Sequence, residues 1–202
     1  MTLERLRPVA DAMLDPVVRL STRVGIGPHA LSLLGFAFAL VAGVAFVLGP
    51  DEPYWYLAAA LFVALSGVFD LLDGAVAREL GVSSAAGDVL DHTLDRYADI
   101  VLVGALAVGS QELLIGFLAV TGVLMTSYLG TQAQAVEYGR LYAGALGRSD
   151  RLALVGMVAV AMFVTDLTVY GLTAVGWLLV LFAVVGHLTA IQRFSILWRE
   201  LT

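Results

Sequence analysis

The chain has 202 residues, 60% of them hydrophobic, and a mean hydropathy of +0.91. That apolar share exceeds the roughly 45–50% of an ordinary soluble domain, so the composition indicates an all-α integral membrane protein with one helical domain. The chain lacks cysteine, which excludes disulfides, thiolate nucleophiles and cysteine metal sites, and its net charge of −6 argues against a nucleic-acid partner.

The first 27 residues predict an amphipathic helix that lies on the cytoplasmic membrane surface. Apolar residues recur there at helical intervals, and charged residues occupy other positions. The apolar residues are Leu3, Leu6, Ala10, Met13, Val17 and Leu20. Pro16 would kink this helix or begin a second turn. We expect residues 1–27 to form a juxtamembrane helix that either caps the bundle or helps to admit lipid. Residues 28–202 would then form a six-helix membrane domain.

Six apolar segments follow, each near the roughly 20 residues that a membrane-spanning helix needs. Their expected bounds are 29–48, 54–75, 87–109, 113–137, 151–166 and 169–191. One helix from Arg151 to Gln192 would be about 60 Å long, twice the hydrocarbon thickness of a bilayer. Two spans with a tight turn near Asp166 are therefore predicted.

The distribution of arginine predicts how these spans are oriented. Arginines precede the first span, separate spans two and three and spans four and five, and follow the sixth: Arg5, Arg7, Arg19, Arg23, Arg78, Arg140, Arg148, Arg151, Arg193 and Arg199. The opposite connections carry only acidic charges, at Asp51, Glu52, Glu112 and Asp166. By the positive-inside rule, this is a multi-pass cell-membrane protein whose two termini face the cytoplasm.

Four aspartates interrupt the second and third spans. Residues 70–95 read D-L-L-D-G-A-V-A-R, then eight residues, then G-D-V-L-D-H-T-L-D. Asp70 and Asp73 are three apart on one helix, and Asp91 and Asp95 are four apart on the next. Carboxylates within a span are costly and repel one another, so these four need a shared cation. Ligation by oxygen alone favours Mg²⁺ or Mn²⁺.

Small residues accompany the aspartates at Gly74, Ala77 and Gly87. They either allow close helix packing or leave room for a ligand. A cation transporter would also place aspartates on two membrane helices, but near mid-membrane and with a path on the other face. Here the acids lie near one end of their spans, beside Arg78, which favours an enzyme facing the cytoplasm.

The complete pattern, D-x-x-D-G-x-x-A-R-x8-G-x3-D-x3-D, resembles the signature of the CDP-alcohol phosphotransferase (CDP-alcohol phosphatidyltransferase) family. The resemblance implies a phospholipid-biosynthetic enzyme that transfers a phosphoalcohol from a CDP-linked lipid donor to a small polar alcohol and releases CMP. It also implies a homodimer in the membrane, with a polar cavity open to the cytoplasm.

The resemblance further implies roles for individual residues. Asp70, Asp73, Asp91 and Asp95 would ligate one or two Mg²⁺ or Mn²⁺ ions, and Asp95 would also be the general base on the acceptor hydroxyl. The nucleotide would be held by Asp70, Gly74, Ala77, Arg78 and Gly87, although Arg78 could instead be an interfacial anchor. His29 stands where the family often has Asn.

The sequence after the last aspartate bears on the acceptor. Asp95-Arg96 with Asp99 three residues further resembles the branch of the family that uses inositol phosphate, in which Ser127, Arg148, Arg151 and Arg193 would bind the acceptor phosphate. The three arginines could instead be positive-inside anchors, and His92 departs from the small residue expected at its place. Glycerol phosphate or serine as acceptor, and a soluble CDP-polyol as donor, remain alternatives.

Overall fold

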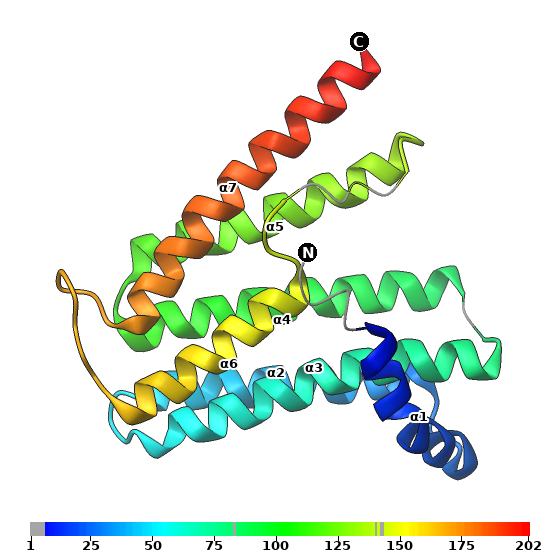
Figure 1. The fold of residues 1–202 in the computed structure, drawn as a ribbon, viewed down its shortest axis with the longest axis horizontal. Helices are drawn as coiled ribbons and strands as arrows, with labels where there is room; N and C mark the ends of the chain where they lie inside the picture. The colour runs from blue at the N-terminus through cyan, green and yellow to red at the C-terminus, as the bar shows by residue number, and fades with distance from the viewer. Residues whose placement is uncertain (1–6, 83, 140, 142–143) are drawn as a thin grey trace.

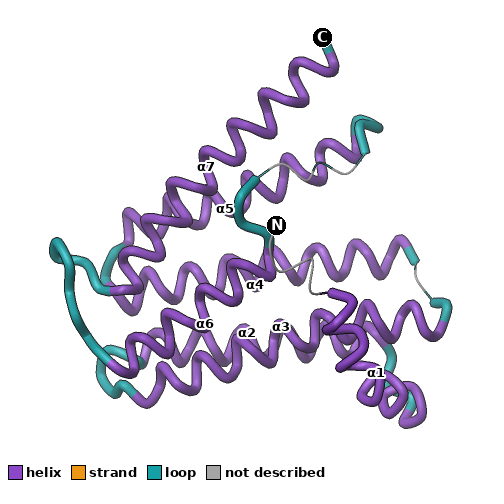
Figure 2. The backbone as a smooth tube through the Cα atoms, viewed as in Figure 1, coloured by secondary structure: helices purple, strands orange, loops and turns teal. Residues whose placement is uncertain are grey.

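The computed structural model describes residues 7–82, 84–139, 141 and 144–202. Within these residues the chain is all-helical, apart from an isolated bridge between Val169 and Leu172. The helices are α1 (Arg7–Val24), α2 (Pro28–Leu48), α3 (Tyr54–Leu80), α4 (Ala85–Ser110), α5 (Leu113–Ala135), α6 (Arg148–Val164) and α7 (Ala174–Leu201) (Figures 1 and 2). The predictions made for Leu3, Arg5, Leu6 and Arg140 concern positions outside the described residues.

Four of these helices, α2, α3, α5 and α7, are long and apolar enough to cross a membrane. Helix α4 is long enough, but charged residues occur from Asp88 to Asp99 along its first half. Helix α6 is apolar but has only 17 residues. The predicted helical fold class is therefore confirmed, and four spans are supported directly by length and composition.

The helix bounds correct the prediction for the last two spans. Helix α6 begins at Arg148, three residues early, because the Asp150 carboxylate accepts a hydrogen bond from the Gly147 amide at 3.0 Å and caps its first turn. The connection after α6 covers residues 165–173 and is not a tight turn at Asp166. Helix α7 starts only at Ala174, because the Thr173 side chain accepts from the Gly176 amide at 3.4 Å.

The helices form two groups that share one core. Helix α2 packs against α3 and α4, α3 also packs against α6, and α5 packs against α7 (Figure 1). Fully buried alanines let the helix backbones approach closely, as is common where helices meet in a membrane; they include Ala39, Ala42, Ala59, Ala119 and Ala159. The connections at residues 49–53, 111–112 and 165–173 gather at one end of the bundle (Figure 2).

Helices α5 and α7 touch backbone to backbone where they cross. A Cβ atom added to Gly186 would lie 2.7 Å from the carbonyl carbon of Gly122. Beside this crossing, the Thr126 hydroxyl donates to the Gly186 carbonyl oxygen at 2.8 Å. Beyond it the two helices diverge toward the C-terminal end of α7 (Figure 1).

Helix α1 lies against α3 at the side of the bundle. Its Val18 is buried with Leu31 and Leu72 in a small second core, whereas Val17 and Leu20 are exposed. The helix continues through Pro16 without a break. The apolar positions that the sequence singled out at Val17 and Leu20 therefore point away from the bundle.

Candidate functional site

The start of α4 aligns four site positions on one stripe. The Ser84 hydroxyl accepts from the Gly87 amide at 3.1 Å and caps the helix. From there Gly87, Asp91, Asp95 and Asp99 follow at intervals of four residues. Because residues four apart lie nearly one above another on a helix, these positions form one stripe, which faces His29 of α2 at Gly87 and Arg151 of α6 at Asp99.

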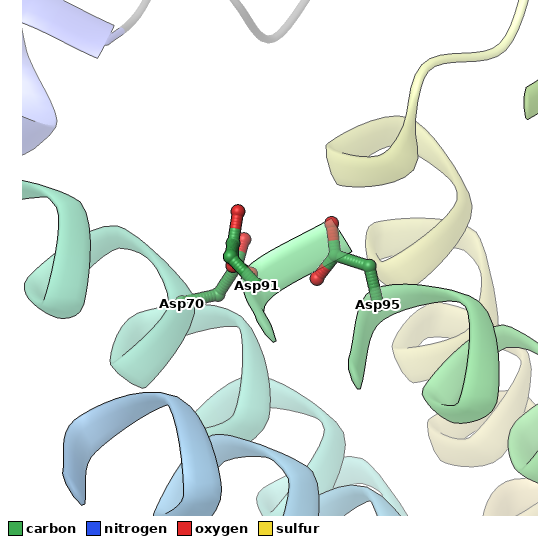
Figure 3. Close-up of side chains that lie close together, drawn as sticks. All are labelled: Asp70, Asp91 and Asp95. Carbon is green, nitrogen blue, oxygen red and sulfur yellow. The ribbon is translucent and has the colours of Figure 1, made fainter. Parts of the chain in front are cut away.

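Three aspartates converge between α3 and α4. Each of Asp70, Asp91 and Asp95 offers a carboxylate oxygen, and the three oxygens lie within 4.8 Å of one another (Figure 3). The carboxylate hollow that they line, together with Asp73, has a volume of about 10 Å³, close to that of one water-sized sphere. An all-oxygen donor set of this kind fits Mg²⁺ or Mn²⁺.

Asp73 lines the same hollow but is fixed by a different helix. It is buried, and its Oδ2 accepts a hydrogen bond from the Ser32 hydroxyl of α2 at 2.5 Å. Asp73 thus lies beside the three clustered carboxylates rather than among them. The bond to Ser32 joins α2 to α3 at the level of the hollow.

Arg148, the first residue of α6, contacts two carboxylates of the cluster. Its Nη1 pairs with a carboxylate oxygen of Asp70 and lies 2.9 Å from Oδ1 of Asp95. The Asp95 and Arg148 side chains are about 15% exposed, so this pairing is poorly screened by water. Arg148 offsets part of the repulsion among the carboxylates.

A second space, which we call the α2–α4 hollow, adjoins the cluster. It has a volume of about 330 Å³, and its lining includes Gly74, Ala77, Arg78 and Gly87. A Cβ atom at Gly87 would lie 3.3 Å from both the His29 ring and the Ser84 hydroxyl, so a larger residue would narrow this space. Of the residues predicted for the nucleotide, only Asp70 lines the carboxylate hollow instead.

A larger space, the arginine cavity, also adjoins the cluster. It has a volume of about 530 Å³, and its lining includes all four residues predicted for the acceptor phosphate: Ser127, Arg148, Arg151 and Arg193. Arg193 is buried and donates to the Thr126 carbonyl oxygen at 2.6 Å. Arg148 lines both this cavity and the carboxylate hollow, so the two spaces meet at its guanidinium group.

Two residues without a predicted role belong to the same region. Arg96 lines the arginine cavity, with Nη2 3.6 Å from Oδ2 of Asp95. Asp99 is buried, and its Oδ2 accepts from Arg151 Nη2 at 2.7 Å. No role was predicted for Asp99 from the sequence, although its position four residues after Asp95 is a signal that could have placed it beside the site.

Membrane-length helices that enclose a carboxylate cluster, with two cavities adjoining it, define a helical membrane protein with an embedded polar site. A family model described as CDP-alcohol phosphatidyltransferase matches residues 26–197. The chain belongs to the CDP-alcohol phosphatidyltransferase family and is a transferase.

Named relatives cover nearly the whole chain. The archaetidylinositol phosphate synthase of Methanothermobacter thermautotrophicus is 30% identical over 204 residues, which is 98% of this chain and 95% of that protein. The phosphatidylinositol phosphate synthase of Streptomyces avermitilis is 29% identical over 199 residues, covering 93% and 79% of the two chains.

Solved structures show the same fold. The crystal structure of Mycobacterium tuberculosis phosphatidylinositol phosphate synthase with CDP-DAG bound matches with a TM-score of 0.72 and 30% identity, covering 91% of this chain and 92% of that one. The same enzyme in complex with manganese and citrate matches with a TM-score of 0.74 and 29% identity, covering 91% and 88%.

Proposed function

We propose that this transferase moves the phosphoalcohol of a CDP-linked lipid, phosphatidyl or archaetidyl, to inositol phosphate and releases CMP. The observation that carries the proposal is the arginine cavity directly beside the carboxylate cluster. Guanidinium groups bind phosphomonoesters through charge-assisted bidentate hydrogen bonds. Serine would not use such a cavity, whereas a phosphorylated polyol would. The names of the relatives, which are inositol phosphate lipid synthases, support the same choice.

The donor's lipid chains would lie further along α3, on its side toward α6. An apolar groove of about 480 Å³ lies between α3 and α6, lined by residues such as Gly67, Leu152 and Gly156. Gly67 precedes Asp70 by three residues, so the groove begins one helical turn from the carboxylate hollow. This arrangement favours a lipid donor over a soluble CDP-polyol, which needs no lateral apolar groove.

The cluster of Asp70, Asp91 and Asp95, with Asp73 beside it, would hold one or two Mg²⁺ or Mn²⁺ ions. When bound, such ions neutralise charge on the donor's diphosphate. The α2–α4 hollow, with Gly74, Ala77, Arg78 and Gly87, would hold the cytidine nucleotide, and Asp70 would contact it from the adjoining hollow.

The transfer reaction removes one proton from the acceptor hydroxyl and releases CMP as the leaving group. The acceptor hydroxyl would lie between the arginine cavity and the cluster, with its proton accepted by the Asp95 carboxylate. Its oxygen forms a bond to the β-phosphorus, and the bond from that phosphorus to the bridging oxygen breaks. CMP leaves with the bridging oxygen. Ser127, Arg148, Arg151 and Arg193 would orient the acceptor through its own phosphate.

The same proposal includes the protein's place in the membrane. Helices α2 to α7 would be six spans, with both termini and the active site in the cytoplasm, as the arginine distribution predicts. Helix α1 would lie on the membrane surface, with its exposed Val17, Leu20 and Val24 in the lipid headgroup region. Residues 28–202 would form the membrane domain, and the enzyme would act as a homodimer.

The test is CMP release by the purified protein in detergent. CDP-diacylglycerol and CDP-archaeol are each combined with Mg²⁺ or Mn²⁺ and with inositol phosphate, glycerol phosphate, serine or inositol. We expect release with inositol phosphate alone among the acceptors, and none after chelation of the metal. Release with glycerol phosphate or serine but not inositol phosphate would refute the proposed acceptor.

A further inference from the structure

Asp99 is a buried carboxylate that the transfer reaction described above does not use. It follows Asp95 by one turn of α4 and is only 6% exposed. Within the described part of the chain it lines neither the arginine cavity nor the carboxylate hollow. An ionised carboxylate out of water is costly unless it is paired and hydrogen-bonded, so its partners indicate its role.

Its main partner is Arg151. Arg151 Nη2 donates to Asp99 Oδ2 at 2.7 Å, and both side chains are more than nine-tenths buried. The other contacts of this guanidinium are weaker: Nη1 lies 3.5 Å from the Leu146 carbonyl oxygen, and Nε has no hydrogen-bond partner among the described residues. Asp99 is therefore the principal anchor of Arg151.

The anchor lies behind the wall of the arginine cavity. Arg151 lines the cavity and Asp99 does not. Asp99 Oδ2 lies 2.7 Å from Arg151 Nη2 and 3.5 Å from Nη1 of Arg96, which also lines the cavity, so Arg151 is its closer link to the cavity. Arg193, in the same wall, is anchored separately by the Thr126 carbonyl oxygen at 2.6 Å. A change at Asp99 should thus release Arg151 and leave Arg193 in place, while Arg96 keeps its contact with Asp95.

We propose that Asp99 is a positioning residue for the acceptor, which fixes Arg151 in the orientation that binds the acceptor phosphate. The inference rests on the proposed function, since it requires a phosphorylated acceptor. A guanidinium group that is already held in place loses less conformational entropy when phosphate binds. The consequence is confined to acceptor binding, because Asp99 is absent from the lining of the hollows assigned to metal and nucleotide.

The test uses Asp99→Asn in the full-length protein. CMP release is measured at saturating CDP-linked lipid while inositol phosphate is varied. We expect the acceptor KM to rise about tenfold or more, with the donor KM and kcat changed less than about threefold. Asp166→Asn is the matched control, because it makes the same charge change at an exposed position between α6 and α7 and should leave all three constants unchanged.

A second variant keeps the test decisive if Asp99→Asn folds poorly. Asp99→Asn leaves the Arg151 charge buried without its partner, whereas Asp99→Asn with Arg151→Gln removes both charges. Because Asp99 acts through Arg151, the double variant should have the acceptor KM of Arg151→Gln alone, within about twofold.

Three results would overturn the inference. One is an unchanged acceptor KM in Asp99→Asn. Another is a double variant whose acceptor KM exceeds that of Arg151→Gln by the same factor by which Asp99→Asn alone raises the acceptor KM. The third is a fall in kcat as large as the rise in the acceptor KM, together with a lowered Tm, which is the pattern of a purely structural residue. Failure of the proposed function is recognised separately, because the unmodified protein would then not use inositol phosphate at all.

Discussion

Asp95 has more contacts with neighbouring charges than the other aspartates of the cluster. It lies within 4.8 Å of the oxygens of Asp70 and Asp91, 2.9 Å from Arg148 Nη1 and 3.6 Å from Arg96 Nη2. Asp95 contacts two cations that line the arginine cavity, Arg96 and Arg148, and the acceptor is proposed to bind there. A proton acceptor at this boundary can reach the acceptor hydroxyl without leaving the cluster.

We expect Asp95→Asn to lower CMP release by at least about 100-fold, because an amide cannot accept the hydroxyl proton. The fold should persist, since Arg148 keeps its ion pair with Asp70. Turnover and thermal unfolding of the purified variant check both parts. Asp166→Asn serves as the control, and an active Asp95→Asn protein would exclude Asp95 as the general base.

The sequence predicted the carboxylate positions because their spacing is local. Residues three or four apart share a helix face, which is enough to place Asp91 and Asp95 together. The pairing of Asp99 with Arg151 joins residues 52 positions apart, and no local pattern specifies which buried arginine a given carboxylate meets. The sequence likewise did not predict that the site residues line three separate spaces, the carboxylate hollow, the α2–α4 hollow and the arginine cavity.

Among the helices, the crossing of α5 and α7 determines how the arginine cavity opens. Both helices carry glycine at the contact, so their backbones meet directly at Gly122 and Gly186. Ser127 follows Gly122 by five residues and Arg193 follows Gly186 by seven, so both come after this contact along their helices. The two helices diverge in that direction (Figure 1). The width of the cavity therefore depends on residues that do not line it.

We expect Gly186→Ala to destabilise the protein by about 1–3 kcal/mol, because its methyl group would be forced against the α5 backbone. Gly104→Ala is the matched control: it also adds a methyl group within a helix, but nothing lies within 4 Å of the position. Thermal unfolding in detergent compares the two variants. Equal stability of both would show that the crossing tolerates a larger separation.

The sequence predicted which segments form helices better than it predicted where each helix begins and ends. Long apolar runs identified α2, α3 and α5 to within a few residues, because a membrane-length segment has few alternatives to a helix. The ends of α6 and α7 depend on single capping contacts at Asp150 and Thr173, which compete with other turn conformations. The final turns of α7 were missed because charged residues were taken to end the helix, although it continues to Leu201.

At the scale of the whole molecule, the absence of cysteine makes membrane orientation directly testable. Glu79 and Asp51 are exposed at opposite ends of α3 and its preceding turn. We expect a membrane-impermeant maleimide added to intact cells to label Asp51→Cys but not Glu79→Cys, because the proposed topology places the arginine-rich end in the cytoplasm. Permeabilised cells should label both variants, and the opposite pattern in intact cells would reverse the topology.

The position of Arg148 has a consequence for how the two sides of the active site respond to ligands. This one guanidinium group belongs to the carboxylate hollow and to the arginine cavity at once. A cation that neutralises Asp70 and Asp95 weakens their hold on Arg148, and an anion in the arginine cavity draws the same group from the other direction. Binding on the two sides is then positively cooperative, and thermodynamic reciprocity requires each ligand to tighten the other by the same factor.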